Sequence, residues 1–385
     1  MRIKLLQKIK ITCFAFIYLV EFKGNLMIRL LKPFVISALL FSNQCVSSEV
    51  LTQSGAEGHV KKTTSQYYVF SGNSNKLLTN TIAQNLSTSL GHSTATRFND
   101  GEIRVKFDES IRKKDIVIVQ STCGTVNGSV NDHIMELILM IKAAKRASAG
   151  SITAIIPYFG YARQDRKSEG RVTISAADVA ELIESAGPTR IITIDLHCGQ
   201  IQGFFRNIPV DNLPVSSIFA PYVANLKLHD PVVVSPDAGG AERAYKFQEQ
   251  LKKLNVEASY AMISKKRAGA GVIEHMSIIG DVNGRDAIII DDMCDTGGTL
   301  VKAAELLKEK GAQKVYVCFT HPVFSNNALQ TIANPIFERV ITTDTIPLRD
   351  KAPDNLVVLS VAPFLARVIE HVQQGTSVSA LLSGG

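Results

Sequence analysis

The residues best suited to chemistry lie in Ala287 to Leu300, which reads AIIIDDMCDTGGTL. The four apolar residues Ala287 to Ile290 predict a short strand buried on both faces, with Asp291 and Asp292 following at its carboxyl end. Thr296 to Thr299 then opens a helical pattern. Glycine permits close approach of the backbone, threonine hydroxyls add donors, and a helix N-terminus favours negative charge, so this turn suits a phosphate.

Three carboxylates in the same loop, those of Asp291, Asp292 and Asp295, would repel a phosphate. A ligand with two ends resolves the conflict, because its phosphate can lie in the Thr/Gly turn while its hydroxyls donate to Asp291 and Asp292. A sugar phosphate has this chemistry. An ordinary strand-to-helix turn with acidic N-caps is the alternative that the loop alone leaves open.

Four more polar loops fall at strand ends, where open α/β sheets bind ligands. They are the basic stretch 161–167, Asp-Leu-His at 195–197, Ser-Pro-Asp-Ala-Gly-Gly at 235–240, and Lys-Lys-Arg at 265–267. Each alone has a plainer explanation as a solvated loop, a structural histidine or a turn. Together they offer cations for a polyphosphate and, in His197 and Asp237, a ligand pair for Mg²⁺, which takes few protein ligands.

Several other classes of protein lack support in the sequence. The chain has no G-x-x-x-x-G-K-[ST] motif and no G-x-G-x-x-G motif after a first strand, which disfavours a P-loop kinase and a dinucleotide-binding protein. No Ser/His/Asp or Cys/His arrangement indicates covalent catalysis.

The elements that must position these loops follow a regular alternation from Tyr67 onward. Predicted strands cover 67–70, 116–119, 152–156, 191–194, 232–234, 287–290, 315–319 and 340–343, and predicted helices include 133–146, 175–185, 241–254 and 300–310. Strands that alternate with helices of this length predict parallel βαβ units and an α/β fold.

The chain also contains an internal repeat. KDIVIVQSTCGTVN (Lys114 to Asn127) is similar to RDAIIIDDMCDTGG (Arg285 to Gly298), and the helix and strand that follow each are similar too. We interpret this as two halves of a duplicated α/β unit, joined near Asn212 to Pro214. The first half has Gln120 and Ser121 where the second has its aspartate pair, so only the second is expected to bind the sugar phosphate.

Length and charge set broad limits. The 385 residues, 45% of them hydrophobic, suffice for one large core or two ordinary ones. Residues 1–62 hold nine Lys and Arg against three Glu, which accounts for +6 of the net charge of +7. The excess basicity therefore belongs to the N-terminal extension and does not indicate a nucleic-acid partner. The six cysteines contain no C-x-x-C pair, as is typical of free thiols in a reducing compartment.

Residues 1–65 differ from the rest of the chain. Two basic starts each precede a short apolar run, Ile11 to Val20 and Phe34 to Phe41, and both runs are too short for a stable membrane span. Each resembles the start of a signal or targeting peptide, with Cys45 to Ser48 suited to cleavage and Met27 as an alternative start. The alternative is an untranslated or disordered extension that carries no targeting signal. We expect a cytoplasmic protein, or a targeted one if the extension is a signal.

Six stretches carry a resemblance to one known family: 98–112 (FNDGEIRVKFDESIR), 133–149, 156–167 (IPYFGYARQDRK), 195–205 (DLHCGQIQGFF), 234–243 (VSPDAGGAER) and 291–299 (DDMCDTGGT). They resemble the ribose-phosphate pyrophosphokinases, or phosphoribosyl pyrophosphate synthetases. The resemblance implies an α/β fold of two tandem phosphoribosyltransferase-like domains, each a mostly parallel sheet flanked by helices. The expected bounds are an extension over 1–65, an N-terminal domain over 66–212 joined by a C-terminal helix at about 363–382, and a C-terminal domain over 213–362.

The activity that the resemblance implies is a Mg²⁺-dependent transfer of the diphosphoryl group of ATP to the 1-hydroxyl of ribose 5-phosphate. The products would be AMP and phosphoribosyl pyrophosphate, for nucleotide biosynthesis. The resemblance also implies site residues: Asp291, Asp292, Asp295, Thr296, Gly297, Gly298 and Thr299 for ribose 5-phosphate, His197 and Asp237 for the metal, Arg163, Gln164, Phe98, Asp100 and Glu102 for ATP, and Lys265 and Arg267 as catalytic cations. Phe98, Asp100 and Glu102 would act from a neighbouring subunit, so a dimer would be the minimum active unit.

A regulatory class is implied as well. Five positions match the effector site of the phosphate-activated class, which implies hexamers and inorganic phosphate as activator: Ser110, Arg112, Arg171, Ser377 and Ser379. Ser168 and the stretch 169–172 depart from the family pattern, which leaves details of the ATP loop and the effector site open. The alternative function is a non-catalytic, synthetase-associated regulatory subunit. Such relatives typically lose catalytic positions, and here those positions are intact.

Overall fold

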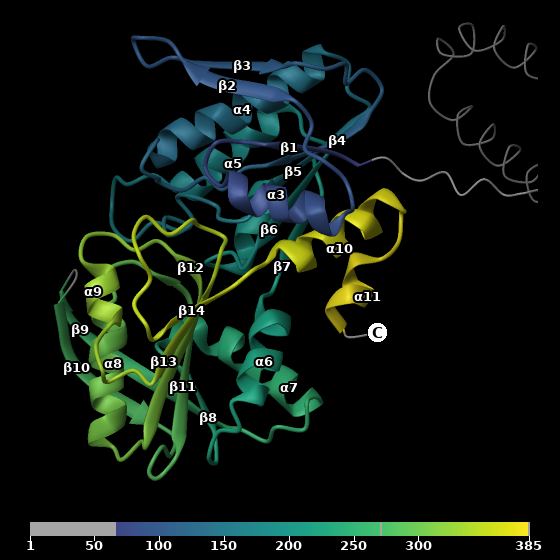
Figure 1. Cartoon of the computed structure of the whole chain (residues 1–385). Coiled ribbons are helices and arrows are strands. Elements are labelled where there is room, and N and C mark those ends of the chain that lie inside the picture. Colours follow the sequence, from purple (N-terminus) through teal and green to yellow (C-terminus); the bar gives the residue numbers. More distant parts are fainter. Residues whose placement is uncertain (1–66, 270–271, 384–385) are drawn as a thin grey trace, which may run out of the picture. The chain divides into compact units, whose positions relative to one another are not determined.

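The computed structural model describes residues 67–269 and 272–383, except for the side chains of 265–275 and 382–383. The extension predicted over 1–65 lies outside the described residues. Those that are described belong to one compact unit, which contains two large sheets flanked by helices (Figure 1). We call each sheet with its helices a lobe.

The first lobe is built on five parallel strands in the order β1-β4-β5-β6-β7. The strands are β1 (Tyr68–Ser71), β4 (Asp115–Val119), β5 (Ser151–Ile156), β6 (Arg190–Ile194) and β7 (Val210–Leu213). The helices are α3 (Lys76–Asn85), α4 (Val130–Arg146) and α5 (Ser175–Ala186), and a separate antiparallel ribbon consists of β2 (Ser93–Arg97) and β3 (Ile103–Phe107).

The second lobe is built on seven strands in the order β10-β9-β8-β11-β12-β13-β14. The strands are β8 (Val232–Ser235), β9 (Ser259–Gly269), β10 (Val272–Ile279), β11 (Asp286–Cys294), β12 (Lys314–Pro322), β13 (Arg339–Thr343) and β14 (Leu356–Leu359). All pair in parallel except β10, which pairs antiparallel with β9. Its helices are α6 (Ser216–Asn225), α7 (Ala241–Lys253), α8 (Gly298–Glu309) and α9 (Ala328–Ile332). Two further helices, α10 (Ala362–Gln373) and α11 (Val378–Ser383), follow β14.

The apolar strands form because they are covered on both faces, as their continuous apolar runs predict. Successive side chains of β4 point to opposite sides of the sheet. Ile116 and Ile118 pack with α4 and α5, whereas Val117 and Val119 pack in a core that also contains residues of α3 and α10. That second core continues into the other lobe through residues of α6, α7 and β11, so apolar packing joins the two lobes.

The strand order repeats between the lobes. In each, five parallel strands follow the same pattern, β1-β4-β5-β6-β7 in the first and β8-β11-β12-β13-β14 in the second, and β9 and β10 are added beside β8. The two strands of the internal repeat, β4 and β11, hold the same place in this order. The predicted fold class, an α/β fold of two mainly parallel sheets, is therefore confirmed. The exact bounds of the two domains, 66–212 and 213–362, stay a prediction.

The first lobe fills the place that corresponds to the aspartate pair. Gln120, which aligns with Asp291 in the repeat, is buried. Its side-chain oxygen accepts hydrogen bonds from the backbone N–H (3.1 Å) and hydroxyl (2.8 Å) of Ser74, and its amide donates to Glu136 (3.0 Å). This position is thus occupied by a hydrogen-bonded side-chain network.

Among the predicted elements whose bounds differ from the structure, two matter for the site and for the C-terminal end. The strand predicted over 287–290 runs on to Cys294, because β12 continues to pair with it as far as Pro322. Asp291 and Asp292 therefore lie within the strand and not after it. The helix predicted over about 363–382 is two helices, α10 and α11, with Gly375 at φ +66° between them. α10 packs against α3 of the first lobe.

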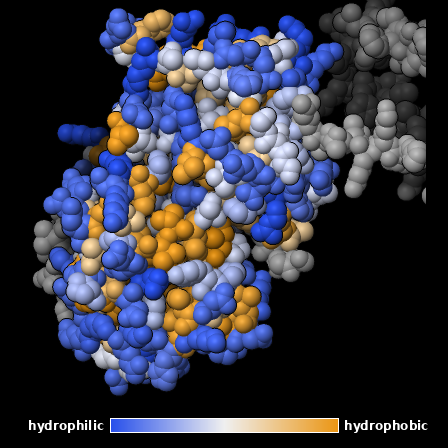
Figure 2. Space-filling view, viewed as in Figure 1, coloured by the Kyte–Doolittle hydropathy of each residue, from blue (hydrophilic) through white to orange (hydrophobic). Residues whose placement is uncertain are grey.

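The surface gives two further observations. On the face drawn in Figure 2, hydrophilic side chains cover most of the area and hydrophobic ones gather near its middle. None of the helices in the described part of the chain has both the length and the apolar character needed to cross a bilayer.

Candidate active site

A cavity of about 970 Å³ opens where the carboxyl ends of strands from both lobes meet. The loop after β5 contributes Asp165 and Arg166, and the residues after β6 contribute Asp195 and His197. The second lobe contributes residues that include Asp237, Asp291 and Asp292. Open parallel sheets bind ligands at this edge, because the loops there are free to vary while the strands hold them.

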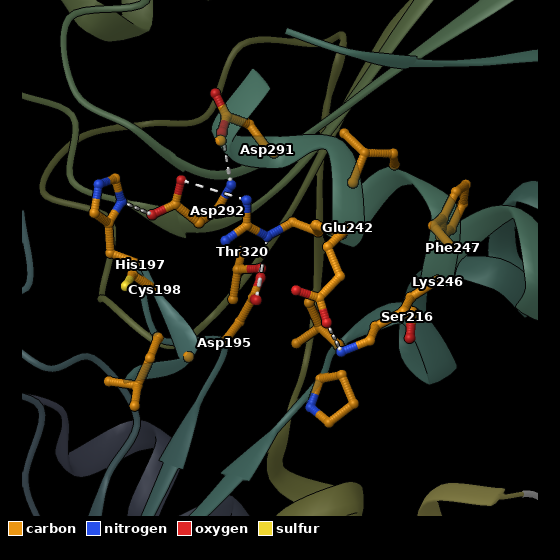
Figure 3. A pocket seen from close by; sticks show the side chains of 18 of the residues that line it. Asp195, His197, Cys198, Ser216, Glu242, Lys246, Phe247, Asp291, Asp292 and Thr320 are labelled. Atoms are coloured by element: carbon orange, nitrogen blue, oxygen red, sulfur yellow. Dashed lines mark hydrogen bonds and ion pairs between the residues drawn. The ribbon is translucent and has the colours of Figure 1, made fainter. Parts of the chain in front are cut away.

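The two adjacent aspartates of β11 have different surroundings (Figure 3). Asp292 Oδ2 lies 2.7 Å from His197 Nδ1, and Asp292 Oδ1 lies 3.8 Å from a guanidinium nitrogen of Arg243. Asp291 Oδ1 accepts a hydrogen bond from the backbone N–H of Asp292 at 2.9 Å. Successive residues of a strand point in opposite directions, which explains why only Asp292 contacts His197.

These surroundings shift the pKa values of the pair in opposite directions. Burial, followed by the charge of Asp292, raises the pKa of Asp291 well above its ordinary value. Burial also opposes ionisation of Asp292, but the hydrogen bond from His197 and the charge of Arg243 lower its pKa overall. The hydrogen bond with Asp292 correspondingly raises the pKa of His197. The pKa values of two carboxylates side by side are thus shifted in opposite directions by their different surroundings.

Asp195, Arg243 and Thr320 were not among the sequence-predicted site residues. The Arg243 side chain is 18% exposed, and its Nε donates to Asp195 Oδ1 at 3.2 Å. Burial opposes the charge of Arg243, yet the carboxylates of Asp195, Asp292 and Asp291 raise its pKa overall. Thr320, which follows the apolar run of β12, donates its hydroxyl to Asp195 Oδ2. The available signal was their position: Asp195 lies in the loop already singled out, Thr320 directly follows a predicted strand, and Arg243 ends the stretch 234–243 that carries the family resemblance.

The predicted sugar-phosphate turn adopts the expected strand-to-helix geometry. Gly297 has φ +79° and precedes the first residue of α8, a conformation that favours glycine. A Cβ atom there would lie 3.0 Å from Thr331 Cγ2, so a side chain would also press on Thr331. Asp295 Oδ2 accepts a hydrogen bond from Arg163 Nη1 at 2.6 Å, which ties the predicted ATP loop to this turn.

The structure brings only some of the predicted residues together. His197, Asp237, Asp291 and Asp292 line the same cavity. The predicted residues outside its lining are Arg163, Gln164, Asp295, Thr296, Gly297, Gly298 and Thr299 of the two loops, and Phe98, Asp100 and Glu102 in the turn between β2 and β3. Lys265 and Arg267 belong to β9, next to the cavity-lining Ser264, but their side chains lie outside the described residues.

The predicted effector residues come from separate segments. Ser110 and Arg112 follow β3, and the guanidinium of Arg112 lies 3.4 Å from Ser148 Oγ. Arg171 precedes α5 at φ +65°, and Ser377 precedes α11, where its hydroxyl accepts from the backbone N–H of Ala380.

Metal ligands are sparse in the described part of the chain. It contains no group of three or more His, Cys, Asp or Glu arranged to hold a metal ion. The predicted pair, His197 and Asp237, lines the cavity, and Asp237 Oδ1 also accepts from the backbone N–H of Gly240 at 3.1 Å. One carboxylate and one imidazole suit an ion that keeps most of its ligands as water and phosphate oxygens, as Mg²⁺ does.

The fold and the acidic strand end followed by a Thr/Gly turn define a protein of the phosphoribosyltransferase type. Two family models match the chain, the N-terminal domain of ribose phosphate pyrophosphokinase over residues 67–187 and a phosphoribosyl synthetase-associated domain over 254–383. Ribose-phosphate pyrophosphokinase of Wolinella succinogenes is 49% identical over 315 residues, 82% of this chain and 98% of that protein. The Campylobacter jejuni protein of the same name is 48% identical with the same coverage.

A solved structure agrees. The crystal structure of phosphoribosylpyrophosphate synthetase from Mycobacterium smegmatis is 40% identical, with a TM-score of 0.73 over 80% of this chain and 99% of that one. The chain belongs to the ribose-phosphate pyrophosphokinase family. The resemblance seen in the sequence is thereby confirmed for the family, while its phosphate-activated class stays a prediction.

Proposed function

We propose that the chain is a ribose-phosphate diphosphokinase, which transfers the β,γ-diphosphoryl group of ATP to the 1-hydroxyl of ribose 5-phosphate. The observation that carries this proposal is the cavity between the lobes, which collects Asp291 and Asp292 with His197 and Asp237. The chain belongs to a family of this name and matches nearly the full length of two named relatives, which supports the same reaction. The products, phosphoribosyl pyrophosphate and AMP, would serve nucleotide biosynthesis.

Ribose 5-phosphate would bind at the end of β11. Its hydroxyls would donate to Asp291 and Asp292, and its 5-phosphate would lie in the turn of Asp295 to Thr299. Backbone N–H groups at the start of α8, left without partners inside the helix, are available to an anion there. Charge-assisted hydrogen bonds to the carboxylates would fix the sugar so that its 1-hydroxyl faces the nucleotide.

ATP would bind with Mg²⁺ on the side of the first lobe. His197 and Asp237 would hold the ion, which when bound neutralises charge on the phosphate oxygens. Arg163 and Gln164 would contact ATP, and Arg163 would have to exchange its partner Asp295 for the nucleotide. Its guanidinium suits phosphate because its donors match two oxygens at once.

Lys265 and Arg267 would supply positive charge to the diphosphoryl group during transfer. Phosphoryl transfer depends on positioning and on charge stabilisation more than on a covalent nucleophile. Because these two residues lie on a segment beside the cavity, their cations can approach the diphosphoryl group once both substrates are bound. Such a movement would also exclude water from the cavity.

The assembly and its regulation belong to the same proposal. Phe98, Asp100 and Glu102 lie in the turn of an exposed ribbon, and Phe98 is 51% exposed, as expected of residues that complete the ATP site of a neighbouring subunit. Dimers would then be the minimum active unit, and hexamers the larger assembly. Inorganic phosphate would activate through Ser110, Arg112, Arg171, Ser377 and Ser379.

The test is an assay of AMP formation from ATP with and without ribose 5-phosphate, in the presence of Mg²⁺. We expect AMP and phosphoribosyl pyrophosphate in equal amounts, and no AMP when the sugar phosphate is left out. Loss of most activity in Asp237→Asn with unchanged folding supports the metal assignment. A wild-type chain that forms no AMP under any of these conditions would instead favour the regulatory-subunit alternative.

A further inference from the structure

Asp195 has a left-handed backbone conformation. Its φ is +41°, in the left-handed region that non-glycine residues rarely adopt. Several contacts hold it there: its N–H donates to the carbonyl of Leu213 at 3.0 Å, and its own carbonyl oxygen lies 3.2 Å from Nε2 of the buried His321. Strain of this kind persists where the surroundings fix a residue, and it concentrates at functional sites.

The side chain of Asp195 reaches across to the second lobe with both oxygens. Oδ1 accepts from Arg243 of α7 and Oδ2 accepts from Thr320 of β12. Together with His321 this gives one residue of the first lobe three partners in the second. In Figure 3, Asp195 and Thr320 lie side by side, on the other side of Asp292 from Asp291.

These contacts close a ring. His197 contacts Asp292 at 2.7 Å, Asp292 lies 3.8 Å from Arg243, and Arg243 donates to Asp195, which precedes His197 by two residues. The ring therefore joins the predicted metal ligand of one lobe to the predicted sugar ligand of the other. Neither Asp195 nor Arg243 needs to touch a substrate to influence both.

We propose that Asp195 and Arg243 are positioning residues, which hold His197 and Asp292 at the correct separation across the two lobes. This inference rests on the proposed function, because the ends of the ring are the residues assigned there to the metal and the sugar. The guanidinium of Arg243 is suited to the task, since its fixed, planar donors can face two carboxylates at once. An ammonium group is a point charge and would satisfy one of them.

The test compares Asp195→Asn, Arg243→Lys and the double variant with the wild-type enzyme. We expect each single variant to lower kcat/KM for ribose 5-phosphate by about 10- to 100-fold, the range for residues that orient a ligand from behind. The KM for ATP should rise as well, because the same ring holds the predicted metal ligand His197. The kcat/KM of the double variant should lie within about threefold of that of the less active single variant. The two losses should not multiply, because both changes break the same ring.

Two matched substitutions of Thr320 separate the loss of a hydrogen bond from a loss of folding. Thr320→Val has the same shape but no donor, and we expect a loss of about 10-fold, whereas Thr320→Ser keeps the hydroxyl and should stay within about twofold of wild type. Ser121→Ala is the control for a general effect of loosening the lobes. Ser121 donates to the carbonyl of Thr345 at 2.6 Å between the lobes and does not line the cavity, so its loss should leave kcat/KM within about twofold.

The outcomes separate this inference from the proposed function. A wild-type chain without AMP formation removes the proposed function. An active wild type in which Thr320→Val equals Thr320→Ser, or in which the losses of Asp195→Asn and Arg243→Lys multiply in the double variant, overturns the positioning role alone. If kcat/KM fell as far in Ser121→Ala as in Asp195→Asn, any loosened contact between the lobes would have the same effect. That result would also overturn the positioning role.

Discussion

At the scale of single residues, the candidate site depends on which partner each polar group has. Asp291 and Asp292 are adjacent in sequence, yet only Asp292 contacts His197 and approaches Arg243. The sequence predicted both as sugar ligands but offered no means of telling them apart, because their difference comes from His197 and Arg243, which lie 95 and 49 positions before Asp292. The same holds for Asp195, whose role depends on contacts that no local pattern indicates.

Asp291→Asn should weaken ribose 5-phosphate binding by about 10-fold, because a charge-assisted acceptor becomes a neutral amide. Asp292→Asn should weaken it more, since that change also removes the acceptor of His197 and a charge near Arg243. Calorimetric titration of each variant with ribose 5-phosphate measures both effects. Equal affinity of Asp291→Asn and wild type would contradict the assignment of that residue to the sugar.

Gly297→Ala should destabilise the protein by about 1–2 kcal/mol, the cost of forcing a side chain into the left-handed region. The added Cβ would also press on Thr331. Gly298→Ala is the matched control, because that glycine has no positive φ and its nearest neighbour to a new Cβ is 4.0 Å away. Urea unfolding of both variants gives the comparison, and equal stabilities would show that the turn tolerates a side chain.

At the scale of elements, continuous apolar runs predicted the central strands because burial on both faces leaves little choice of residue. The eight predicted strands and four predicted helices all occur. Strands with weaker apolar patterns were not predicted. The ribbon β2–β3 alternates half-buried and exposed residues, and β9 and β10 form an antiparallel pair that includes the polar stretch 265–267. The extra length of β11 depends on pairing with β12, which local sequence does not show.

The sequence contains a local signal for the start of α4 that the predicted bounds do not reflect. The predicted helix began at His133, whereas α4 begins at Val130 because Ser129 and Asp132 form a capping box. Hydrogen bonds to Arg97, then to Ser129, lower the pKa of Asp132. Its carboxylate is thus more stable in the folded state than in the unfolded one.

Asp132→Asn should therefore lower the free energy of unfolding by about 1 kcal/mol at pH 7. A depressed folded-state pKa adds stability above the unfolded pKa of about 4, which is lost as pH falls through the folded value. The difference between variant and wild type should accordingly shrink as the pH is lowered from 5 toward 3. Urea unfolding at several pH values measures it, with the exposed Asp354→Asn as control. A difference that does not depend on pH would contradict the role of the charge.

At the scale of the whole molecule, the two lobes and the interface between them decide what the site can do. The cavity takes residues from both lobes, and several hydrogen bonds and an apolar core cross between them. The internal repeat predicted two related halves, and the strand order agrees. It did not predict how His197 of one half would meet Asp292 of the other, because a repeat specifies each half and not their contact.

Shared sites between subunits lead to a complementation experiment. Phe98→Ala and Lys265→Ala should each be nearly inactive alone, the first lacking the neighbour's contribution to ATP and the second a catalytic cation. Mixed and reassociated, they should regain about a quarter of wild-type activity, because half of random dimers are mixed and each mixed dimer holds one intact site. Activity assays before and after mixing measure this. A mixture that remains as inactive as its components would mean that each chain completes its own site.

The network around Gln120 limits how many sugars the molecule can take. Although the fold is present twice, the first copy fills the equivalent position with its own amide, which Ser74 and Glu136 hold in place. Restoring an aspartate there would place a negative charge beside the buried carboxylate of Glu136, so one substitution cannot recreate a second site. We therefore expect each polypeptide to bind one pentose, in the second lobe, while the first lobe contributes to the site for ATP and its metal.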